Sequence, residues 1–301
     1  MSVISPKKQE KHERDMAQIA RKGSIWGEAW KRLYRNKLGM LGLIIIAILV
    51  VLVVGADIFS THDFAYQDYT VRFAYPSREH IMGADNFGRD LWSRLLHGGR
   101  ISLLISLCSV VVSVGCGAFL GSTAAYFGGK IDLAITRLLD ALMAIPNLLL
   151  AVAIASALGT GPSKTVMAIS ISGIPGSMRI MRATVLSIKS NDFVEAARAT
   201  GSKHFRIIFK HILPNTVAPL IVNSTLQIGG NIMAISSLSF IGLGVQAPIA
   251  EWGAILSSGR QYIRDFWPLI VFPALFIFMT VFSVNLLGDG LRDALDPRLR
   301  D

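Results

Sequence analysis

The chain has 301 residues, of which 52% are hydrophobic and 17% are charged, and its formal net charge is +10. A soluble domain of this length cannot bury so much apolar surface, so the composition excludes an ordinary soluble protein and indicates an integral membrane protein. The positive charge would also fit a nucleic-acid-binding protein, but the basic residues follow the pattern of a membrane protein, and no nucleic-acid partner is expected.

The N-terminal segment, residues 1–37, carries ten Lys and Arg before the first apolar run. It is too long for the charged part of a signal peptide, so we expect the apolar run to be a retained span. Near its end, aromatic and apolar residues recur at helical spacing among basic ones: Trp26, Trp30, Leu33 and Tyr34. This pattern predicts a helix on the cytoplasmic membrane surface, with the aromatic rings at headgroup level.

Five uncharged runs are each long enough to cross about 30 Å of hydrocarbon as a helix. They cover residues 38–56, 101–129, 141–163, 212–250 and 266–288. A sixth run, residues 165–178, contains Gly173, Pro175 and Gly176 and is marginal by itself. With it, 22 of the 30 Lys and Arg lie on the cytoplasmic side, as the positive-inside rule requires. We therefore predict an all-α integral membrane protein with six transmembrane helices and both termini cytoplasmic.

Two charged stretches lie close to the predicted spans. Residues 89–99 are amphipathic, with Leu91, Trp92, Leu95 and Leu96 on one helical face. The opposite, polar face carries Arg89, Ser93, Arg94 and His97, and the pattern predicts a helix lying on the outer membrane surface. At the inner end of the third span, Arg137 and Asp140 are three residues apart, and we expect them to form a structural ion pair rather than a proton relay.

Patterns for catalysis and metal binding are absent from the sequence. Gly128-Gly129-Lys130 is followed by Ile131 and lacks the upstream Gly of a phosphate-binding loop, so no ATP hydrolysis is expected from this chain. There is no Gly-x-Ser-x-Gly nucleophile elbow. The six histidines are scattered without metal-site spacing, so we predict no metal and no catalytic residues. Ionisable groups inside the spans are nearly missing, which argues against a membrane-embedded enzyme and a secondary transporter.

The segment 190–214 joins the fourth and fifth spans and predicts two short helices with a break between them. Asp192 and Glu195 fit a capping box at the first helix, and Gly201 fits the left-handed residue that ends it. Ala196, Ala197 and Ala199 would give this helix a face with little side-chain bulk, which a partner can approach closely. An ordinary helix-turn-helix connector without a partner is the alternative.

The second helix of this segment is predicted to start with Ser202 as its cap and to end where Pro214 breaks the chain. Its apolar face would carry Phe205, Ile208, Phe209 and Ile212.

Amide side chains recur in the otherwise apolar fifth span. Asn223, Gln227 and Asn231 are spaced by four residues and line one stripe of a helix. The stripe is a candidate for a wet, polar surface within the membrane, and Asn147 and Asn285 are further candidates. The alternative is that these amides form hydrogen bonds between helices.

Several motifs resemble those of one transporter family. Glu195-Ala196-Ala197, with Gly201 and the Ile-Leu-Pro of residues 212–214, resembles the Glu-Ala-Ala loop of ABC importer permeases. Residues 80–94 are similar to the H-x-x-G-T-D-x-x-G-R-D-x-x-S-R segment of dipeptide and oligopeptide importer permeases, with Ala84 in place of Thr. Further similar motifs occupy residues 126–129, 248–253 and 288–297. The last of these, with the short outer loop after the first span, resembles the C-type member of the permease pair.

The resemblance implies a type I ABC importer permease fold with three regions. These are a cytoplasmic N-terminal tail and interfacial helix at 1–37, a six-span permease domain at 38–288 with the coupling loop at 190–214, and a cytoplasmic tail at 289–301. It assigns coupling to an ATPase to Glu195, Ala196, Ala197 and Gly201. It also makes the stripe of Asn223, Gln227 and Asn231 a candidate translocation path, which would admit a peptide backbone.

The implied function is that of a permease subunit, not an enzyme, in an ATP-driven, binding-protein-dependent importer of dipeptides or oligopeptides. Nickel, glutathione or another small solute is the alternative substrate. The implied partners are a second homologous permease, two ATPase subunits that hold ATP and Mg, and an extracytoplasmic substrate-binding protein. The implied location is the cytoplasmic (inner) membrane, and no cofactor is expected in this chain.

Overall fold

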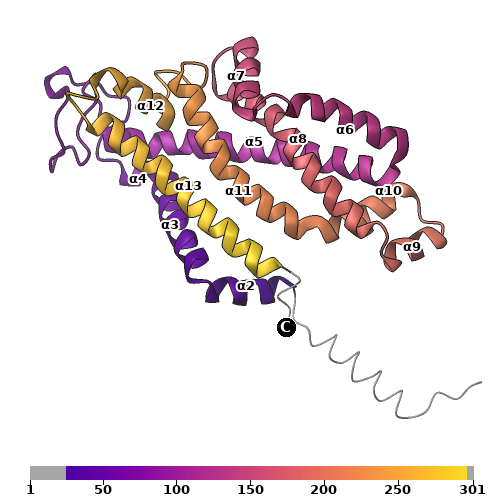
Figure 1. The fold of residues 1–301 in the computed structure, drawn as a ribbon. Helices are drawn as coiled ribbons and strands as arrows, with labels where there is room; N and C mark the ends of the chain where they lie inside the picture. Colours follow the sequence, from indigo (N-terminus) through magenta and orange to yellow (C-terminus); the bar gives the residue numbers. More distant parts are fainter. Residues whose placement is uncertain (1–24, 297–301) are drawn as a thin grey trace, which may run out of the picture.

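The computed structural model describes residues 25–296, so the predicted terminal tails lie partly outside the described residues. The described part is helical, with one isolated bridge between Ala84 and Asp90 (Figure 1). Its elements are α2 (Ile25–Arg35), α3 (Lys37–Val54), α4 (Ala56–Phe59), η1 (Tyr69–Val71), α5 (Leu91–Phe127), α6 (Gly129–Met143), α7 (Asn147–Leu158), α8 (Pro162–Ile188), α9 (Asp192–Ala199), α10 (His204–Arg206), η2 (Ile207–Ile212), α11 (Leu213–Phe240), α12 (Trp252–Gly259), η3 (Arg260–Tyr262) and α13 (Pro268–Leu295).

Four helices of the described chain are long and apolar enough to cross a membrane: α3, α5, the continuous α10–η2–α11 and α13. The pair α6 and α7, which meet at 88°, makes a fifth if it counts as one broken span. Helix α8 has 27 residues and therefore the length of a span, but it falls short in apolar composition. The predicted six spans are thus reached only with the bent pair and α8.

The third predicted span is wrong in its boundaries. Helix α6 begins at Gly129, well before residue 141, and the chain turns at Pro146, the cap of α7. Proline has no backbone N–H and clashes with the preceding turn, which explains the break. By contrast, Pro175 lies buried inside α8 without ending it.

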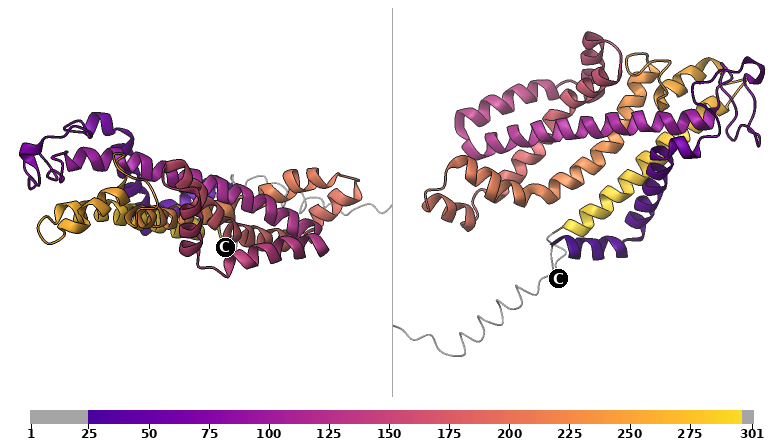
Figure 2. Two further views of the ribbon diagram at one scale, coloured as in Figure 1. Left: turned by 90° about the horizontal axis from the view of Figure 1, so that it is seen from above. Right: turned by 180° about the vertical axis from the view of Figure 1, so that it is seen from behind.

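Helices α5 and α8 pack along one another (Figure 2). Small residues allow this close packing. A Cβ on Gly117 would lie 2.5 Å from the Cβ of Ser177, and one on Gly121 would lie 2.6 Å from the carbonyl oxygen of Met178. Both distances are shorter than real Cβ contacts, so the two backbones approach as closely as glycine permits.

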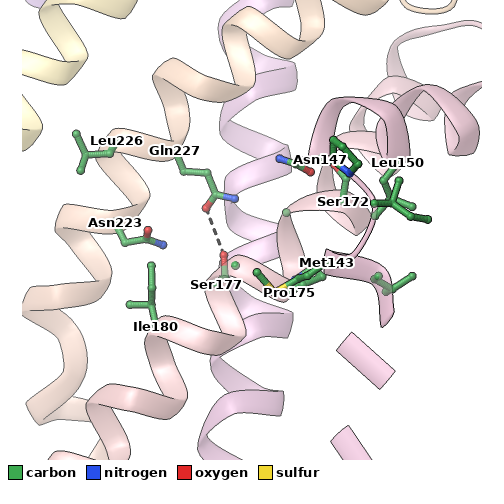
Figure 3. Close-up of a pocket in the computed structure, with 15 residues that line it drawn as sticks. Met143, Asn147, Leu150, Ser172, Pro175, Ser177, Ile180, Asn223, Leu226 and Gln227 are labelled. Atoms are coloured by element: carbon green, nitrogen blue, oxygen red, sulfur yellow. Dashed lines mark hydrogen bonds between the residues drawn. The ribbon is translucent and has the colours of Figure 1, made fainter. Parts of the chain in front are cut away.

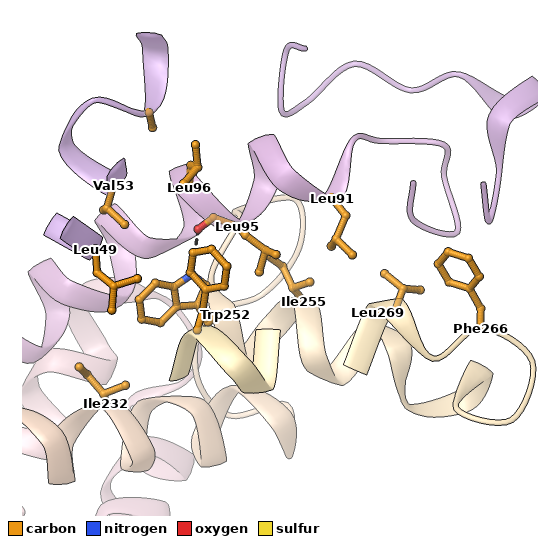
Figure 4. Packing of buried hydrophobic residues seen from close by; sticks show 12 residues of the cluster. Leu49, Val53, Leu91, Leu95, Leu96, Ile232, Trp252, Ile255, Phe266 and Leu269 are labelled. Carbon is orange, nitrogen blue, oxygen red and sulfur yellow. Dashed lines mark hydrogen bonds between the residues drawn. The ribbon is translucent and has the colours of Figure 1, made fainter. Parts of the chain in front are cut away.

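One end of the bundle is closed by a cluster around Trp252 (Figure 4). Its indole Nε1 donates to the carbonyl oxygen of Leu95 at 2.8 Å. Glu251 is fully buried and caps α12 by accepting hydrogen bonds from the backbone N–H groups of Gly253 and Ala254. The cluster fixes the N-terminal part of α5 against α12 and α13.

The amphipathic helix predicted at residues 89–99 is present from Leu91, but its predicted polar face is wrong. Leu91 is the first residue of the 37-residue helix α5, so this segment continues directly into the span. Ser93 and Arg94, expected on a polar outer face, are buried along with Leu95. Asp90 and Asp85, which precede the helix, are the polar partners of Ser93 and Arg94 and allow their burial. Helical periodicity describes positions within a helix and therefore could not predict these partners.

The helix predicted near Trp26 and Tyr34 is confirmed as α2, but Leu33 does not share the aromatic face to which the sequence assigned it. Ala29 and Leu33 pack against Ala294 of α13, whereas Trp26, Trp30 and Tyr34 are more than half exposed. An exposed aromatic row suits a membrane interface, and that placement stays a prediction. Helix α13 continues to Leu295, so the predicted C-terminal tail is helical in its described beginning.

Candidate functional site

A cavity of about 430 Å³ opens beside the break between α6 and α7 (Figure 3). Its walls come from this break, from α8 around Pro175 and from α11. The polar lining residues are Asn147, Ser172, Ser177, Asn223 and Gln227. Among the described residues that line it, none carries a charge.

Gln227 connects three helices at the edge of this cavity. Its Nε2 donates to Ser113 Oγ of α5 at 3.0 Å, and Ser177 Oγ of α8 donates to its Oε1 at 3.4 Å. Gln227 therefore lines the cavity and also forms hydrogen bonds between helices. The two roles that the sequence offered as alternatives for the amides are thus combined in this residue. Because the amide is held on both ends, its position depends on how α5, α8 and α11 sit together.

Only part of the predicted stripe of amides lines the cavity. Asn223 and Gln227 line the cavity, and Asn147 joins them from α7. Asn231 does not line it: its side chain is buried, and its Nδ2 has no hydrogen-bond partner among the described residues. Asn285 is also absent from the lining and lies beside Gly229. Equal spacing along one helix could not reveal which neighbours each amide meets.

The segment after α8 folds into α9, a turn and the start of the long helix through α11. Gly201 has a φ of +74°, which confirms the predicted left-handed residue. The predicted capping residues are wrong. Asn191 precedes α9, so Asp192 is already helical, and Lys203 rather than Ser202 precedes α10. Neither Asn191 nor Lys203 makes a side-chain capping hydrogen bond within the described chain.

The three alanines of α9 do not form one open face. Ala197 is only 7% exposed, and with Val194 it joins a cluster that includes Ile207 and Ile212. Glu195, Ala196 and Ala199 are exposed. Neighbouring residues on a helix point about 100° apart, which explains why Ala196 and Ala197 differ. Of the four predicted coupling residues, Ala197 is thus an internal anchor, and the other three are accessible.

The helix that follows also presents a different face from the predicted one. Ile207, Ile208 and Ile212 are buried, whereas Phe205 and Phe209 are 68% and 56% exposed and stack on each other. Residues 207–212 form a π-helix, whose wider turn shifts side chains away from α-helical spacing.

Pro214 does not break the chain as predicted. It is the second residue of α11, and the helix is continuous from His204 to Phe240. The π-helical turn directly before it changes the hydrogen-bond pattern where a proline N–H would be needed.

Tyr126, at the end of α5, connects this loop to the bundle. Its hydroxyl lies 2.8 Å from Nδ1 of His204, and the guanidinium of Arg198 lies over its ring at 5.3 Å from the centroid. Nearby, Lys189 Nζ donates to the carbonyl oxygen of Ala125 at 2.9 Å. The motif at residues 126–129 gave no sign of this contact, because it joins positions 78 residues apart.

Two ion pairs hold α6 against α8. Arg182 donates to both carboxylate oxygens of Asp132, and Arg179 donates to Asp140 at 3.0 Å. The predicted pair between Arg137 and Asp140 is therefore wrong. The partner of Asp140 comes from the adjacent helix, which sequence spacing within α6 could not show.

The segment 80–94 forms a buried polar network before α5. Arg89 Nε donates to Asp85 at 2.7 Å, with Arg94 at 3.5 Å from the same carboxylate. Asp90 caps α5 by accepting from the backbone N–H of Ser93 at 2.8 Å. The motif thus organises the folded loop at this end of the molecule.

Two family models match the chain. Residues 117–301 match the binding-protein-dependent transport system inner membrane component. Residues 24–76 match the N-terminal TM domain of oligopeptide transport permease C.

Similar proteins include transport permeases of known kinds. The dipeptide transport system permease protein DppC of Alkalihalophilus pseudofirmus is 42% identical over 277 residues, covering 92% of this chain and 91% of that protein. The glutathione transport system permease protein GsiD of Pectobacterium atrosepticum is 40% identical over 276 residues, covering 91% and 92%. A chain from an inward-facing structure of the MetNI methionine ABC transporter shares the fold, with a TM-score of 0.56, 17% identity, and coverage of 68% of this chain and 97% of that one.

Proposed function

The chain belongs to the family of binding-protein-dependent transport system inner membrane components, and from this premise we propose that it imports dipeptides or oligopeptides as the C-type member of a permease pair. The protein is a membrane permease subunit with the fold of type I ABC importers, and it is not an enzyme. The observation that carries the substrate class is the 42% identity to a dipeptide permease across 92% of the chain. Glutathione is the alternative, supported by a relative at 40% identity.

The uncharged cavity beside α8 and α11 supports a role in translocation. Asn147, Asn223 and Gln227 offer amide donors and acceptors, which match the N–H and C=O groups of a peptide backbone. Without a charged lining, such a path would not select among side chains. We therefore assign Asn223 and Gln227 to this chain's half of the path, whereas Asn231 belongs to it only if the second permease or a conformational change opens its surroundings.

The loop 190–214 suits coupling to an ATPase subunit, which would hold ATP and Mg. Glu195 and Ala196 would contact the ATPase, Gly201 would set the turn, and Ala197 would hold α9 to its own chain. The exposed pair Phe205 and Phe209 extends this surface. Movement of α9 would reach α5 through the contacts of Arg198 and His204 with Tyr126, and α5 carries Ser113, a partner of Gln227.

In the assembled importer, residues 1–37 would lie on the cytoplasmic side, 38–288 would form the permease domain, and 289–301 would return to the cytoplasm. The second permease would close the open side of the cavity, two ATPase subunits would bind beneath, and an external binding protein would deliver peptide at the end that carries α12.

Reconstituted transport tests this proposal. The chain would be co-expressed with its partner permease and ATPase subunits, placed in proteoliposomes, and supplied with binding protein and a labelled dipeptide. We expect accumulation that requires ATP and the ATPase subunits, with a hydrolysis-defective ATPase as the control. Accumulation without the ATPase subunits would contradict the importer mechanism. Uptake of glutathione but not of any dipeptide would favour the alternative substrate.

A further inference from the structure

His62, Glu79 and His80 come together in the loop between α4 and α5. Their spacing in the sequence does not match a known metal-binding motif. One ligand atom from each lies within 4.8 Å of the others. The two imidazole rings stack with centroids 4.7 Å apart. Sequence spacing predicts no metal, because His62 comes from the segment after α4, and the other two residues come from a turn that folds back beside it.

Both rings are oriented by hydrogen bonds at the same nitrogen. Nδ1 of His80 lies 3.0 Å from a carboxylate oxygen of Asp90, and Nδ1 of His62 lies 3.0 Å from the hydroxyl of Thr61. This leaves Nε2 of each ring as the nitrogen that can bind a metal. A carboxylate behind a histidine is the usual outer partner of a metal ligand, because it fixes the tautomer and raises the basicity of the ring.

Hydrogen bonds from neighbouring residues hold the backbone and side chains around the cluster in place. Asp90 is buried, and one of its oxygens accepts hydrogen bonds from Ser93 Oγ at 2.7 Å and from Thr61 Oγ1 at 3.2 Å. The backbone N–H of His62 also donates to Ser93 Oγ. The backbone of His80 is held by Ser77 on both its N–H and its carbonyl oxygen. His80 is therefore fixed, and only His62 and Glu79 need to move to complete a site.

Zinc binding requires the accessible side chains of the cluster to move closer together. Zinc binds imidazole nitrogens at about 2.0 Å, so ligand atoms in a tetrahedral site lie roughly 3.3 Å apart. One ligand atom of each residue lies within 4.8 Å of the others, so His62, whose side chain is 34% exposed, and the exposed Glu79 must rotate to reach that spacing. Two imidazoles and a carboxylate match Zn²⁺ better than Mg²⁺ or Ca²⁺, which prefer oxygen ligands.

We propose that His62, Glu79 and His80 bind one Zn²⁺ ion at this end of the molecule. The three residues leave a fourth position for water or for a group from another molecule. The ion links the segment after α4 to the turn before α5, and through Asp90 it stiffens the N-terminus of α5. Binding does not depend on the substrate of the transporter or on its coupling to an ATPase.

Zinc titration of the full-length chain tests the site. The protein would be purified in lipid nanodiscs with an affinity tag that contains no histidine, and Zn²⁺ would be titrated against a chelating indicator. We expect one Zn²⁺ per chain and a higher midpoint of thermal unfolding with Zn²⁺, because the ion binds only the folded loop. Mg²⁺ should give neither effect. X-ray absorption should show nitrogen and oxygen neighbours without sulfur, which excludes Cys108 and Cys116 as ligands.

Variants identify the ligands. His62→Gln and Glu79→Gln should each abolish the tight site, and both should fold without zinc, since His62 is half-buried and Glu79 is exposed. Thr61→Val removes the hydroxyl behind His62 and should weaken Zn²⁺ binding by about 10- to 100-fold. His97→Gln is the matched control, because His97 lies at the same end but pairs with Asp57. The proposal is overturned if the parent chain binds no Zn²⁺, or if both His62→Gln and Glu79→Gln bind it as the parent does.

Discussion

At the residue scale, the turn after α9 depends on one backbone conformation. Gly201 has a φ of +74°, and a Cβ there would meet no described atom within 4 Å. The cost of a side chain is therefore conformational, about 1–2 kcal/mol for a residue other than glycine or asparagine. We predict that Gly201→Val lowers ATP-driven uptake and retention of the ATPase subunits during purification. Gly201→Asn, which tolerates this conformation, should stay close to the parent, and equal loss in both variants would contradict the argument.

Variants of Ala196 and Ala197, two neighbouring alanines of α9, distinguish an effect on ATPase coupling from an effect on folding. Ala197→Asp would bury an unpaired charge among Val194 and Ile207, so the loop should detach and the thermal unfolding midpoint should fall. Ala196→Asp lies on the exposed face and should leave the midpoint of the chain unchanged while weakening ATPase retention and uptake. Both quantities can be measured on the same preparations. If Ala196→Asp retained the ATPase subunits and transported normally, this face would not be the contact.

Residue-level prediction from the sequence succeeded where a property is local. The positive φ of Gly201 follows from the chemistry of glycine at the end of a helix, and the structure confirms it. The pairing of Asp140 with Arg179 and the burial of Ala197 depend on which helix lies alongside, so sequence spacing gave the wrong answer for both. The contact between Tyr126 and His204 was missed for the same reason.

At the element scale, the close approach of α5 and α8 determines the wall of the cavity, because Ser113 and Ser177 both bind Gln227. Gly117→Leu would force bulk into Ser177, and overpacking typically costs about 1–3 kcal/mol. We predict a lower unfolding midpoint and impaired uptake. Gly115→Leu is the control on the same helix, since a Cβ there meets no described atom within 4 Å. Equal unfolding midpoints for the two variants would show that the helices do not pack through Gly117.

The apolar runs predicted where the long helices lie, but they did not predict at which residues those helices begin and end. Apolar runs mark the part of a helix that meets lipid, whereas α5 and α6 extend into polar sequence that is satisfied by partners elsewhere. Asp90 caps α5 from the loop that precedes it, and Arg182 neutralises Asp132 in the first turn of α6. The prolines also did not predict where helices end. Pro146 turns the chain, whereas Pro175 and Pro214 lie within helices. Only tertiary packing and the π-helical turn distinguish these cases.

At the scale of the whole molecule, α12 and α9 lie at opposite ends of the bundle (Figure 1). The loop before α5 and the segment before α13 meet at the α12 end, since the hydroxyl of Tyr75 donates to the carbonyl oxygen of Asp265 and its ring packs on Phe266. These are the segments that the charge distribution assigns to the outside, and the basic loop around α9 is the one that it assigns to the inside. We therefore propose one placement in the membrane, with the α12 end outside and the α9 end in the cytoplasm, which agrees with the predicted distribution of basic residues.

That placement predicts the result of topology mapping. Reporter fusions after Pro76 and after Gly253 should report the outside, and a fusion after Lys203 should report the cytoplasm. The bent pair α6–α7 and the less apolar α8 must together cross the membrane twice for this to hold, which is the part that composition alone leaves weakest. A fusion after Gly161, between α7 and α8, therefore gives the sharpest check and should also report the outside. If it reported the cytoplasm while Lys203 did as well, α6 and α7 would form a re-entrant hairpin and α8 would not span the bilayer.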